Sequence, residues 1–496
     1  MKRDYSGLQN GSDIRGVAIE GENPRTLGPE EAFCLSAAFG KWLSDRCGKA
    51  PSELKIAVGH DSRLSAGSLK EHVCRGLAFL GAKALDCGLA STPAMFMATQ
   101  FAAYDCDGAI MITASHLPQD RNGFKYFSRE GGLDKEDISA ILKAAGQLEP
   151  GTEIAPAAAE KAELMSTYCA FLREKIEKEV GGKQPLSGLK IVVDAGNGAG
   201  GFYALNVLAP LGADVSGSQF LEPDGSFPNH QPNPENKEAM ASICQAVLDN
   251  HADLGLIFDT DVDRSSAVDK NGREINRNAI VAMAAALIAP EHPGTTVVTD
   301  SITSDELTEY LEKCLGLKHL RFRRGYRNVI NKAIELNRQG IDSQLAIETS
   351  GHAAYKENYF LDDGAYLATK IVIKAAQMKK AGADLSAVLA SLREPTEALE
   401  KRFTVLRDDF AAYGQQVLDG LESWIDENGA AFGASVVRPN YEGVRINFDN
   451  EKVRGWCLLR KSLHDPKLPL NVEVTSGSCS DILQVIEDFL RGWEVA

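Results

Sequence analysis

The chain has 496 residues, which is enough for several domains of about 100–150 residues each. Its formal net charge of −16 argues against nucleic acid as a partner, because a phosphate backbone requires a basic surface. No secretory apolar segment is seen at the start, and the most apolar stretch, residues 279–290, is too short to cross a membrane. Ten cysteines are scattered without a Cys-x-x-Cys pair, which indicates reduced thiols in a cytoplasmic protein.

Apolar, β-branched runs that end in polar loops occur in three pairs along the chain, as a loose internal repeat. The first runs cover residues 54–61, 189–198 and 295–301, and the second runs cover residues 108–116, 254–264 and 344–352. Such runs are typical of buried parallel strands, and roughly 50–70 residues from one run to its partner leave room for helical crossovers. Because open α/β sheets build sites at the carboxyl ends of strands, we expect functional side chains in the loops after the second runs.

The C-terminal part departs from this repeat. It holds the strand-like runs GVRINFD, GWCLLR and LNVEV, and then SDILQVIEDFLRGW, where the pair Ser480-Asp481 is typical of a helix N-cap. The sequence therefore predicts an α/β fold with three similar α/β domains of mixed, largely parallel sheets and a smaller C-terminal α+β domain. The predicted domains cover residues 1–160, 161–275, 276–395 and 396–496.

The loop after the run at residues 108–112 contains Ser115, and an Asn-Gly turn precedes Lys125. A serine hydroxyl is a poor nucleophile without a base or metal, and the chain shows no recognisable Ser-His-Asp order. A phosphorylated serine is different, because its charge of about −2 can be neutralised by a divalent cation, which opens the phosphorus to attack. The residues alone leave the role of Ser115 open.

A glycine-rich turn follows the run at residues 189–194. Gly196, Gly198 and Gly201 spell G-x-G-x-x-G, and Glu222 lies at the distance of a ribose contact in dinucleotide-binding proteins. The alternative is a tight turn from strand to helix in which glycine permits close packing. We favour the tight turn, because no group suited to hydride transfer lies nearby in the sequence.

The motif DTDVDR supplies Asp259, Asp261 and Asp263 at alternate positions, which share one face of an extended chain. Three hard oxygen ligands suit Mg²⁺. An EF-hand is excluded, because its sixth position is Arg264 instead of glycine and its twelfth is Lys270 instead of glutamate. A solvated acidic turn is the alternative, but three adjacent carboxylates repel one another unless a cation lies among them.

The same motif also resembles the haloacid-dehalogenase phosphatases and mutases. In that family the first aspartate, here Asp259, would accept the phosphoryl group, and the second, Asp261, would be the acid/base. The segment LDDG at residues 361–364 could then serve as the later acidic motif. The mid-chain position, the third carboxylate and the attached arginine fit a metal site better.

TASH, DTDVDR and ETSGH stand in this order on three similar units, and together they resemble the α-D-phosphohexomutases, the phosphoglucomutase/phosphomannomutase superfamily. The resemblance covers essentially the whole chain and implies four domains around a central cleft. It implies an enzyme that interconverts hexose 1-phosphate and hexose 6-phosphate, of glucose or mannose, through a hexose 1,6-bisphosphate that is both intermediate and activator. The implied partners are a small phosphosugar and one Mg²⁺ per chain.

The resemblance also implies roles for residues in the first two domains. TASHLP matches the phosphoserine loop, with Leu117 where asparagine is commoner. NGFK implies Lys125 as a general acid/base, which requires a pKa lowered by nearby cations. The implied catalytic residues are Ser115, Lys125, Arg15, Arg264 and His116. The implied metal ligands are Ser115, Asp259, Asp261 and Asp263.

Substrate-binding residues are implied in the last two domains. ETSGH matches the sugar loop, and RKSLHDP stands where the family carries a phosphate loop close to R-x-S-G-T-E-P. The departures at residues 463–465 bear on affinity and substrate preference. The implied ligands are Glu348, Ser350, His352, Arg460, Ser462 and His464. The turn RRGYR adds Arg324, Tyr326 and Arg327 as candidates, with a solvated basic face as the alternative.

Several readings of the function stay open at this point. The form DIRG near the N-terminus favours glucose and mannose phosphates, and phosphoglucosamine mutase is the alternative. A non-catalytic sugar-phosphate sensor on the same fold is a further alternative, although a sensor does not need a phosphoryl donor. The sequence identifies neither the preferred hexose nor the oligomeric state.

Overall fold

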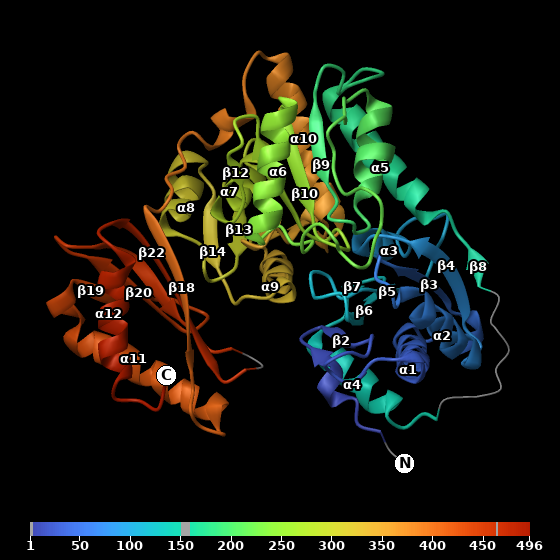
Figure 1. The fold of residues 1–496 in the computed structure, drawn as a ribbon, viewed down its shortest axis with the longest axis horizontal. Coiled ribbons are helices and arrows are strands. Elements are labelled where there is room, and N and C mark those ends of the chain that lie inside the picture. The colour runs from blue at the N-terminus through green and yellow to red at the C-terminus, as the bar shows by residue number, and fades with distance from the viewer. Residues whose placement is uncertain (1–2, 150–158, 463–464) are drawn as a thin grey trace. The chain divides into compact units, whose positions relative to one another are not determined.

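The computed structural model describes residues 3–149, 159–462 and 465–496 (Figure 1). His464, a predicted phosphate ligand, lies outside the described residues. The chain forms two compact units: the first comprises Met1–Leu287 and Ser350–Val388, and the second comprises Ile288–Thr349 and Leu389–Ala496. The boundary at Thr349 and Ser350 falls inside the predicted sugar loop.

The first unit begins with a sheet of strand order β1-β2-β6-β5-β3-β4-β8, which is parallel from β5 to β8 and antiparallel from β1 to β5. Its strands are β1 (Gln9–Asn10), β2 (Asp13–Val17), β3 (Lys55–His60), β4 (Lys83–Leu89), β5 (Gly108–Ile112), β6 (Arg121–Ser128), β7 (Gly131–Gly132) and β8 (Glu160–Lys161). Its helices are α1 (Pro29–Cys47), α2 (Ala66–Phe79), α3 (Thr92–Met97) and α4 (Lys135–Ala145). The loops after β3 and β5 therefore lie at one edge of this sheet.

Helix α1 illustrates how local sequence defines an element here. It has Pro29 at its first position, where the missing N–H costs nothing, and it ends at Gly48 in the left-handed conformation (φ 66°). Its buried face packs against α2 and α4 and joins the core of the first domain.

The first unit continues with a second sheet of order β12-β11-β10-β9, in which β9 and β10 are parallel. Its strands are β9 (Ile191–Asp194), β10 (Leu254–Phe258), β11 (Ser265–Asp269) and β12 (Glu274–Ile275), and β16 (Ala353–Tyr355) pairs with β17 (Leu361–Asp362) in the same unit. The helices are α5 (Leu164–Val180), α6 (Lys237–Asn250), α7 (Asn278–Ile288) and α10 (Gly364–Lys380). Helix α10 packs against α5, β10 and β11, which joins the late segment to this domain.

The glycine-rich turn after β9 is packed against its neighbours. A Cβ on Gly198 would lie 2.6 Å from the Thr260 carbonyl oxygen, and one on Gly201 would lie 2.2 Å from the Leu221 carbonyl oxygen. Both distances are too short for any side chain. Close backbone approach therefore accounts for these glycines, in line with the tight turn that we favoured.

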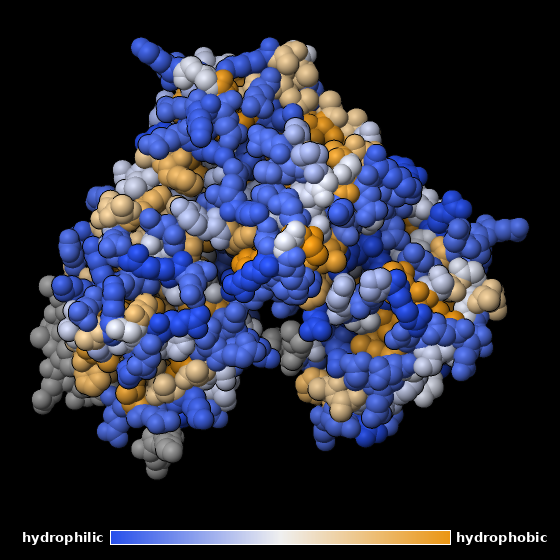
Figure 2. Space-filling view, turned by 180° about the vertical axis from the view of Figure 1, so that it is seen from behind, coloured by the Kyte–Doolittle hydropathy of each residue, from blue (hydrophilic) through white to orange (hydrophobic). Residues whose placement is uncertain are grey.

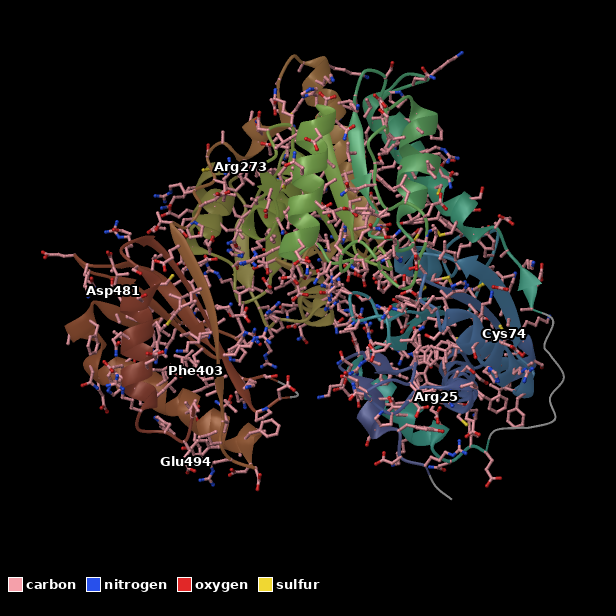
Figure 3. The ribbon with its side chains drawn as sticks, in the orientation of Figure 1. Arg25, Cys74, Arg273, Phe403, Asp481 and Glu494 are labelled. Carbon is pink, nitrogen blue, oxygen red and sulfur yellow. The ribbon has the colours of Figure 1, made fainter. Side chains whose placement is uncertain are left out.

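In the second unit, β13 pairs in parallel with β14 on one side and β15 on the other. These elements are β13 (Thr296–Thr299), β14 (Lys318–Arg321), β15 (Leu345–Ile347), α8 (Asp305–Glu309) and α9 (Tyr326–Arg338). An antiparallel sheet of order β18-β22-β21-β20-β19 follows, formed by β18 (Glu397–Thr404), β19 (Ala434–Val436), β20 (Val444–Asp449), β21 (Arg454–Leu459) and β22 (Lys467–Ser476). Helices α11 (Phe410–Asn428) and α12 (Cys479–Leu490) share a core with this sheet that includes Phe403 (Figures 1 and 3).

The predicted fold class is confirmed: three α/β domains with mixed, largely parallel sheets precede a C-terminal β-rich domain. The predicted N-cap of the last helix is wrong by two residues. Gly477 has a φ of 82°, which turns the chain early, so Ser478 is the cap and its side chain accepts a hydrogen bond from the Ser480 N–H. Asp481 lies in the first helical turn, where a negative charge is favourable.

All ten cysteines are free thiols and most are buried, as is Cys74 on α2 (Figure 3). The cytoplasmic location inferred from their pattern stays a prediction. Among the described residues, no helix is long and apolar enough to cross a membrane. Hydrophilic side chains predominate on the face in Figure 2, with apolar ones scattered among them.

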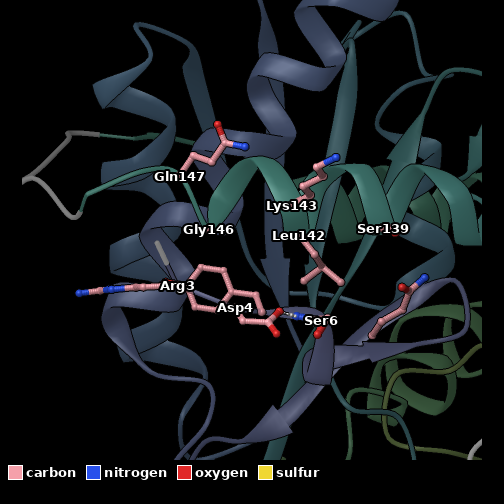
Figure 4. A pocket seen from close by; sticks show the side chains of 10 residues that line it. Arg3, Asp4, Ser6, Ser139, Leu142, Lys143, Gly146 and Gln147 are labelled. Atoms are coloured by element: carbon pink, nitrogen blue, oxygen red, sulfur yellow. Dashed lines mark hydrogen bonds between the residues drawn. The ribbon is translucent and has the colours of Figure 1, made fainter. Parts of the chain in front are cut away.

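One cavity of about 340 Å³ lies between the N-terminal segment and α4 (Figure 4). Its lining includes Arg3, Asp4, Ser139 and Lys143. None of the predicted site residues lines it, so it plays no part in the site described next.

Candidate active site

Ser115 lies in the loop at the carboxyl end of β5 and is buried. Its φ of 50° is a left-handed conformation that non-glycine residues rarely adopt. Its N–H donates to Thr113 Oγ1 at 2.8 Å, and its Oγ donates to Asp259 Oδ2, also at 2.8 Å. A serine of the first domain is thus joined directly to an aspartate of the second.

The three aspartates of DTDVDR follow β10, and all are buried. Their ligand atoms lie within 4.8 Å of one another. One oxygen each of Asp261 and Asp263 is buried without a hydrogen-bond partner, and burial with the neighbouring carboxylates raises the pKa of Asp259 well above its ordinary value. A divalent cation would bind the unpaired oxygens and offset the repulsion among the carboxylates. This set of hard oxygens therefore fits Mg²⁺.

Lys125 projects from β6, opposite Met111 of β5, into the acidic cluster. Its Nζ contacts Asp263 and lies 3.3 Å from Asp261 Oδ2, and its charge holds the pKa of Asp263 far below the ordinary value in spite of burial. Nearby cations were expected to lower the pKa of Lys125. Its direct partners are carboxylates, because β6 runs beside β5 and meets the loop of the second domain.

Arg15 on β2 is paired with Asp13, 2.7 Å from its Nη2 to Oδ2, and its Nη1 is buried without a hydrogen-bond partner. Burial opposes its charge, but the carboxylate of Asp13 outweighs this and raises the pKa of Arg15. Asp261 and Asp263 add to that effect. A buried guanidinium with an unused N–H is suited to binding a phosphate oxygen.

Arg264 links the acidic loop to two histidines. Its Nε donates to His352 Nε2 at 2.8 Å, and its Nη2 lies 3.0 Å from His116 Nδ1. Burial, then the charge of Arg264, lowers the pKa of His116 to about 2, so this ring is neutral near pH 7. The adjacent Ser115 Oγ is 3.3 Å from the same His116 nitrogen.

His352 Nδ1 contacts Asp362 on β17, which fixes the orientation of the imidazole. Asp363 accepts hydrogen bonds from the Tyr168 hydroxyl at 2.6 Å and the Tyr366 N–H at 2.8 Å, and so caps α10. The two aspartates of LDDG thus orient a histidine and begin a helix. These roles do not match the later acidic motif of the haloacid-dehalogenase alternative.

A second group of predicted residues gathers in the second unit. Glu348 Oε1 accepts from the Gly325 N–H at 2.7 Å, which brings the sugar loop and the RRGYR turn together. Burial, then Glu348, raises the pKa of Asp300 to about 7. Arg324 Nε lies 3.7 Å from Asp300 Oδ2.

The phosphate loop contributes Arg460 to this group. Burial, then the charge of Arg324, lowers the pKa of Arg460, and its Nε is buried without a hydrogen-bond partner. Ser462 Oγ accepts from the Asp465 N–H at 3.3 Å. Ser350 is buried in the first unit, and Tyr326 and Arg327 begin α9.

Sequence reasoning missed two residues that support the site, one at the acidic loop and one at the Ser115 loop. Thr92, at the start of α3, donates its hydroxyl to Asp261, and its N–H donates to the Asp261 carbonyl at 2.8 Å. Arg63 follows β3 at the same sheet edge and contacts the Ser115 loop. The strand-end rule could have found Arg63, because HDSR follows an apolar run as TASH does; nothing in the sequence indicated Thr92.

Models of the phosphoglucomutase/phosphomannomutase α/β/α domains I, II and III match residues 7–149, 166–272 and 276–395. The chain is 30% identical over 480 residues to a phosphomannomutase/phosphoglucomutase from Pseudomonas putida, which covers 97% of this chain and 93% of that protein. The chain belongs to the phosphoglucomutase/phosphomannomutase family.

Other members of the phosphoglucomutase/phosphomannomutase family show the same full-length similarity. A phosphoglucomutase from Neisseria gonorrhoeae is 28% identical over 95% of this chain and 94% of its own length. The crystal structure of a phosphoglucomutase/phosphomannomutase family protein from Burkholderia thailandensis matches with a TM-score of 0.77 and 27% identity, over 99% of this chain and 97% of that one.

Proposed function

We propose that this protein is a phosphohexomutase that interconverts hexose 1-phosphate and hexose 6-phosphate, with glucose and mannose as the sugars. The observation that carries the proposal is the 2.8 Å hydrogen bond from Ser115 Oγ to Asp259, within a cluster of three buried carboxylates. Family membership supports the reaction, and the names of the relatives from Pseudomonas and Neisseria support the sugars.

The proposal gives Asp259, Asp261 and Asp263 the role of Mg²⁺ ligands, together with an oxygen on Ser115. A bound Mg²⁺ would neutralise phosphate charge next to the serine. Lys125, Arg15 and Arg264 surround the same cluster and add positive charge from the protein. Phosphoryl transfer depends mainly on such positioning and charge.

In the proposed reaction a sugar hydroxyl attacks the phosphorus on Ser115. The new sugar O–P bond forms as the Ser115 O–P bond breaks, and the Ser115 oxygen leaves with the electron pair. Lys125 takes the proton of the attacking hydroxyl and returns it in the reverse step, which requires that a bound Mg²⁺ neutralise the carboxylates beside its Nζ. The resulting hexose 1,6-bisphosphate then reorients in the site. Its other phosphate is transferred back to Ser115.

Substrate binding is assigned to the groups of the sugar and phosphate loops. Glu348, which is buried at 5% exposure, accepts hydrogen bonds from sugar hydroxyls, and Ser350 assists it. Arg460 holds the phosphate that is not reacting, because its buried and unused Nε–H favours an anionic ligand. Arg324, whose like charge repels that of Arg460, supplies a second contact to the same anion.

Phosphoglucosamine mutase is the alternative that one observation favours. A phosphoglucosamine mutase from Lactobacillus delbrueckii subsp. bulgaricus is 27% identical over 430 residues, which cover 85% of this chain and 90% of that protein. The coverage is lower than for the phosphomannomutase/phosphoglucomutase from Pseudomonas. Glucose and mannose phosphates are therefore preferred.

A substrate panel tests the proposal. The purified protein is supplied with Mg²⁺, a trace of hexose 1,6-bisphosphate, and the 1-phosphate of glucose, mannose or glucosamine, and 6-phosphate formation is measured by a coupled assay. We expect turnover of glucose and mannose phosphates and phosphate on Ser115 by peptide mass spectrometry. Turnover of glucosamine phosphate alone would establish the alternative, and phosphate on Asp259 would overturn the serine mechanism.

A further inference from the structure

Arg63 is an almost fully buried charged residue that the reaction described above does not use. It follows β3 and is 2% exposed. Its guanidinium donates hydrogen bonds to four backbone carbonyl oxygens of one loop: those of Ser115, Leu117 (2.7 Å), Pro118 (2.8 Å) and Arg121 (2.9 Å). These carbonyls lie between residue 115 and the first residue of β6, so one side chain holds the loop from Ser115 onward.

The counter-ion of Arg63 fixes the other side of the same serine. Asp61 Oδ2 lies 3.3 Å from Arg63 Nε and accepts the Thr113 hydroxyl at 2.7 Å. That hydroxyl oxygen accepts the Ser115 N–H at 2.8 Å. The peptide groups on both sides of the Ser115 Cα are thus fixed by one buried ion pair, and this holds the φ of 50° that turns its Oγ to Asp259.

The surroundings of Arg63 close it off from any ligand. The Phe227 ring lies 5.3 Å from its guanidinium carbon. At Gly225 a Cβ would come within 2.5 Å of the Ser62 carbonyl oxygen and the Leu64 nitrogen, so the second domain packs tightly over this turn. Arg63 therefore acts through the loop rather than by touching substrate.

We propose that Arg63, with its counter-ion Asp61, is a positioning residue for phosphoryl transfer that keeps Ser115 Oγ at the acidic cluster. Loss of the guanidinium would release the carbonyls of residues 115–121 and allow the left-handed serine to relax. The hydroxyl would then spend less time at Asp259. The inference rests on the proposed function, because it needs Ser115 to carry the phosphoryl group.

The test uses the full-length Arg63→Lys and Arg63→Ala variants. Lysine keeps the charge but cannot reach four carbonyls, so we expect kcat to fall about 100-fold with KM for glucose 1-phosphate within about threefold. Transfer from glucose 1,6-bisphosphate to Ser115, followed in a single turnover, should slow by the same factor. Added guanidinium ion should restore part of the activity of Arg63→Ala.

The matched control is Arg445→Lys. Arg445 is also buried and binds a backbone carbonyl, that of Ser301 at 3.2 Å, but it lies outside the proposed machinery. Both lysine variants should lose thermal stability, and only Arg63→Lys should lose kcat. A folded Arg63→Lys with wild-type kcat would overturn the positioning role, whereas a wild-type protein that never phosphorylates Ser115 would overturn the proposed function itself.

If both Arg63 variants fail to fold, Thr113→Val tests the same set of hydrogen bonds around Ser115. Valine matches threonine in shape but breaks the link from Asp61 to the Ser115 N–H, whereas Thr113→Ser keeps the hydroxyl. We expect kcat to fall about tenfold in the valine variant and to stay near wild type in the serine variant. Equal kcat in the two variants would contradict the proposal.

Discussion

The acidic cluster of the first unit consists of Asp259, Asp261 and Asp263. The arginine group of the second unit consists of Arg324 and Arg460 and has the opposite charge. Around Asp259, burial, then the carboxylates of Asp263 and Asp261, raises the pKa of the Asp259 carboxyl. Around Arg460, burial and Arg324 disfavour the positive charge. The first group therefore gains most from a bound cation, and the second gains most from a bound anion. The two groups should thus respond differently to substitution, metal and pH.

Ser115→Ala is expected to have the largest effect. Without the hydroxyl no phosphoryl group can be carried, so turnover in the coupled assay should fall at least about 1,000-fold. Mg²⁺ affinity, measured by calorimetry, should change only a few-fold, because the three aspartates remain. Full activity in this variant would refute the scheme.

Asp261→Asn removes a carboxylate from the acidic cluster. We expect the Mg²⁺ concentration for half-maximal activity to rise at least about tenfold, while KM for hexose phosphate changes less. Asp249→Asn is the matched control, because Asp249 is an exposed acid on α6 that accepts a hydrogen bond from Gln245, away from the acidic cluster. An unchanged Mg²⁺ requirement in Asp261→Asn would remove the metal role from this loop.

Arg460→Ala should show the opposite pattern. Loss of a charge-assisted hydrogen bond to phosphate should raise KM about 10- to 100-fold and leave the Mg²⁺ requirement unchanged. Arg438→Ala is the control, since Arg438 is an exposed arginine of the same domain, paired with Glu422 and Asp426. Equal losses in substrate and metal binding would contradict the separation of the two groups.

A third charge cluster, outside both groups, should give the smallest effect and serves as a reference. Burial raises the pKa of Glu357, but Lys175 and Lys370 outweigh it and lower the pKa to about 2. A lowered carboxyl pKa adds stability above about pH 4.5 that is lost as pH falls towards 2. Because the Glu357 side chain is 36% exposed, we expect it to contribute only about 1–2 kcal/mol to the free energy of unfolding.

The measurement for this cluster is urea unfolding of wild type and Glu357→Gln from pH 7 to pH 3. The stability difference should be largest at pH 7 and should shrink below about pH 4.5 as Glu357 takes up a proton. Hexose phosphate turnover at pH 7 should be unchanged. A stability difference that is constant with pH would show that Glu357 does not titrate as its surroundings require.

The loops that bear chemistry could be predicted from the sequence because each follows an apolar strand. This rule located Ser115, the DTDVDR aspartates and Glu348 without any knowledge of contacts. It could not show which loops meet: the Ser115–Asp259 bond joins residues 144 positions apart. The partners of Lys125 could not be predicted either, because a lysine on a strand gives no sign of which loop it faces.

Buried supports were the least predictable part of the site. The strand-end rule could place Arg63 near the site, but only the structure shows its four carbonyl contacts. Asp362 was interpreted as part of an alternative acidic motif, but it orients His352. Such residues act through partners distant in sequence, so their type and local spacing carry little information.

The return of residues 350–388 to the first unit has a consequence for synthesis of the chain. When the nascent chain ends at residue 349, every ligand of the acidic cluster has been synthesised, but His352, Asp362 and helix α10 have not. The first unit therefore cannot reach its final packing while the nascent chain ends there. We expect a fragment of residues 1–349 to be cut readily by proteases within α5, because α5 packs against α10.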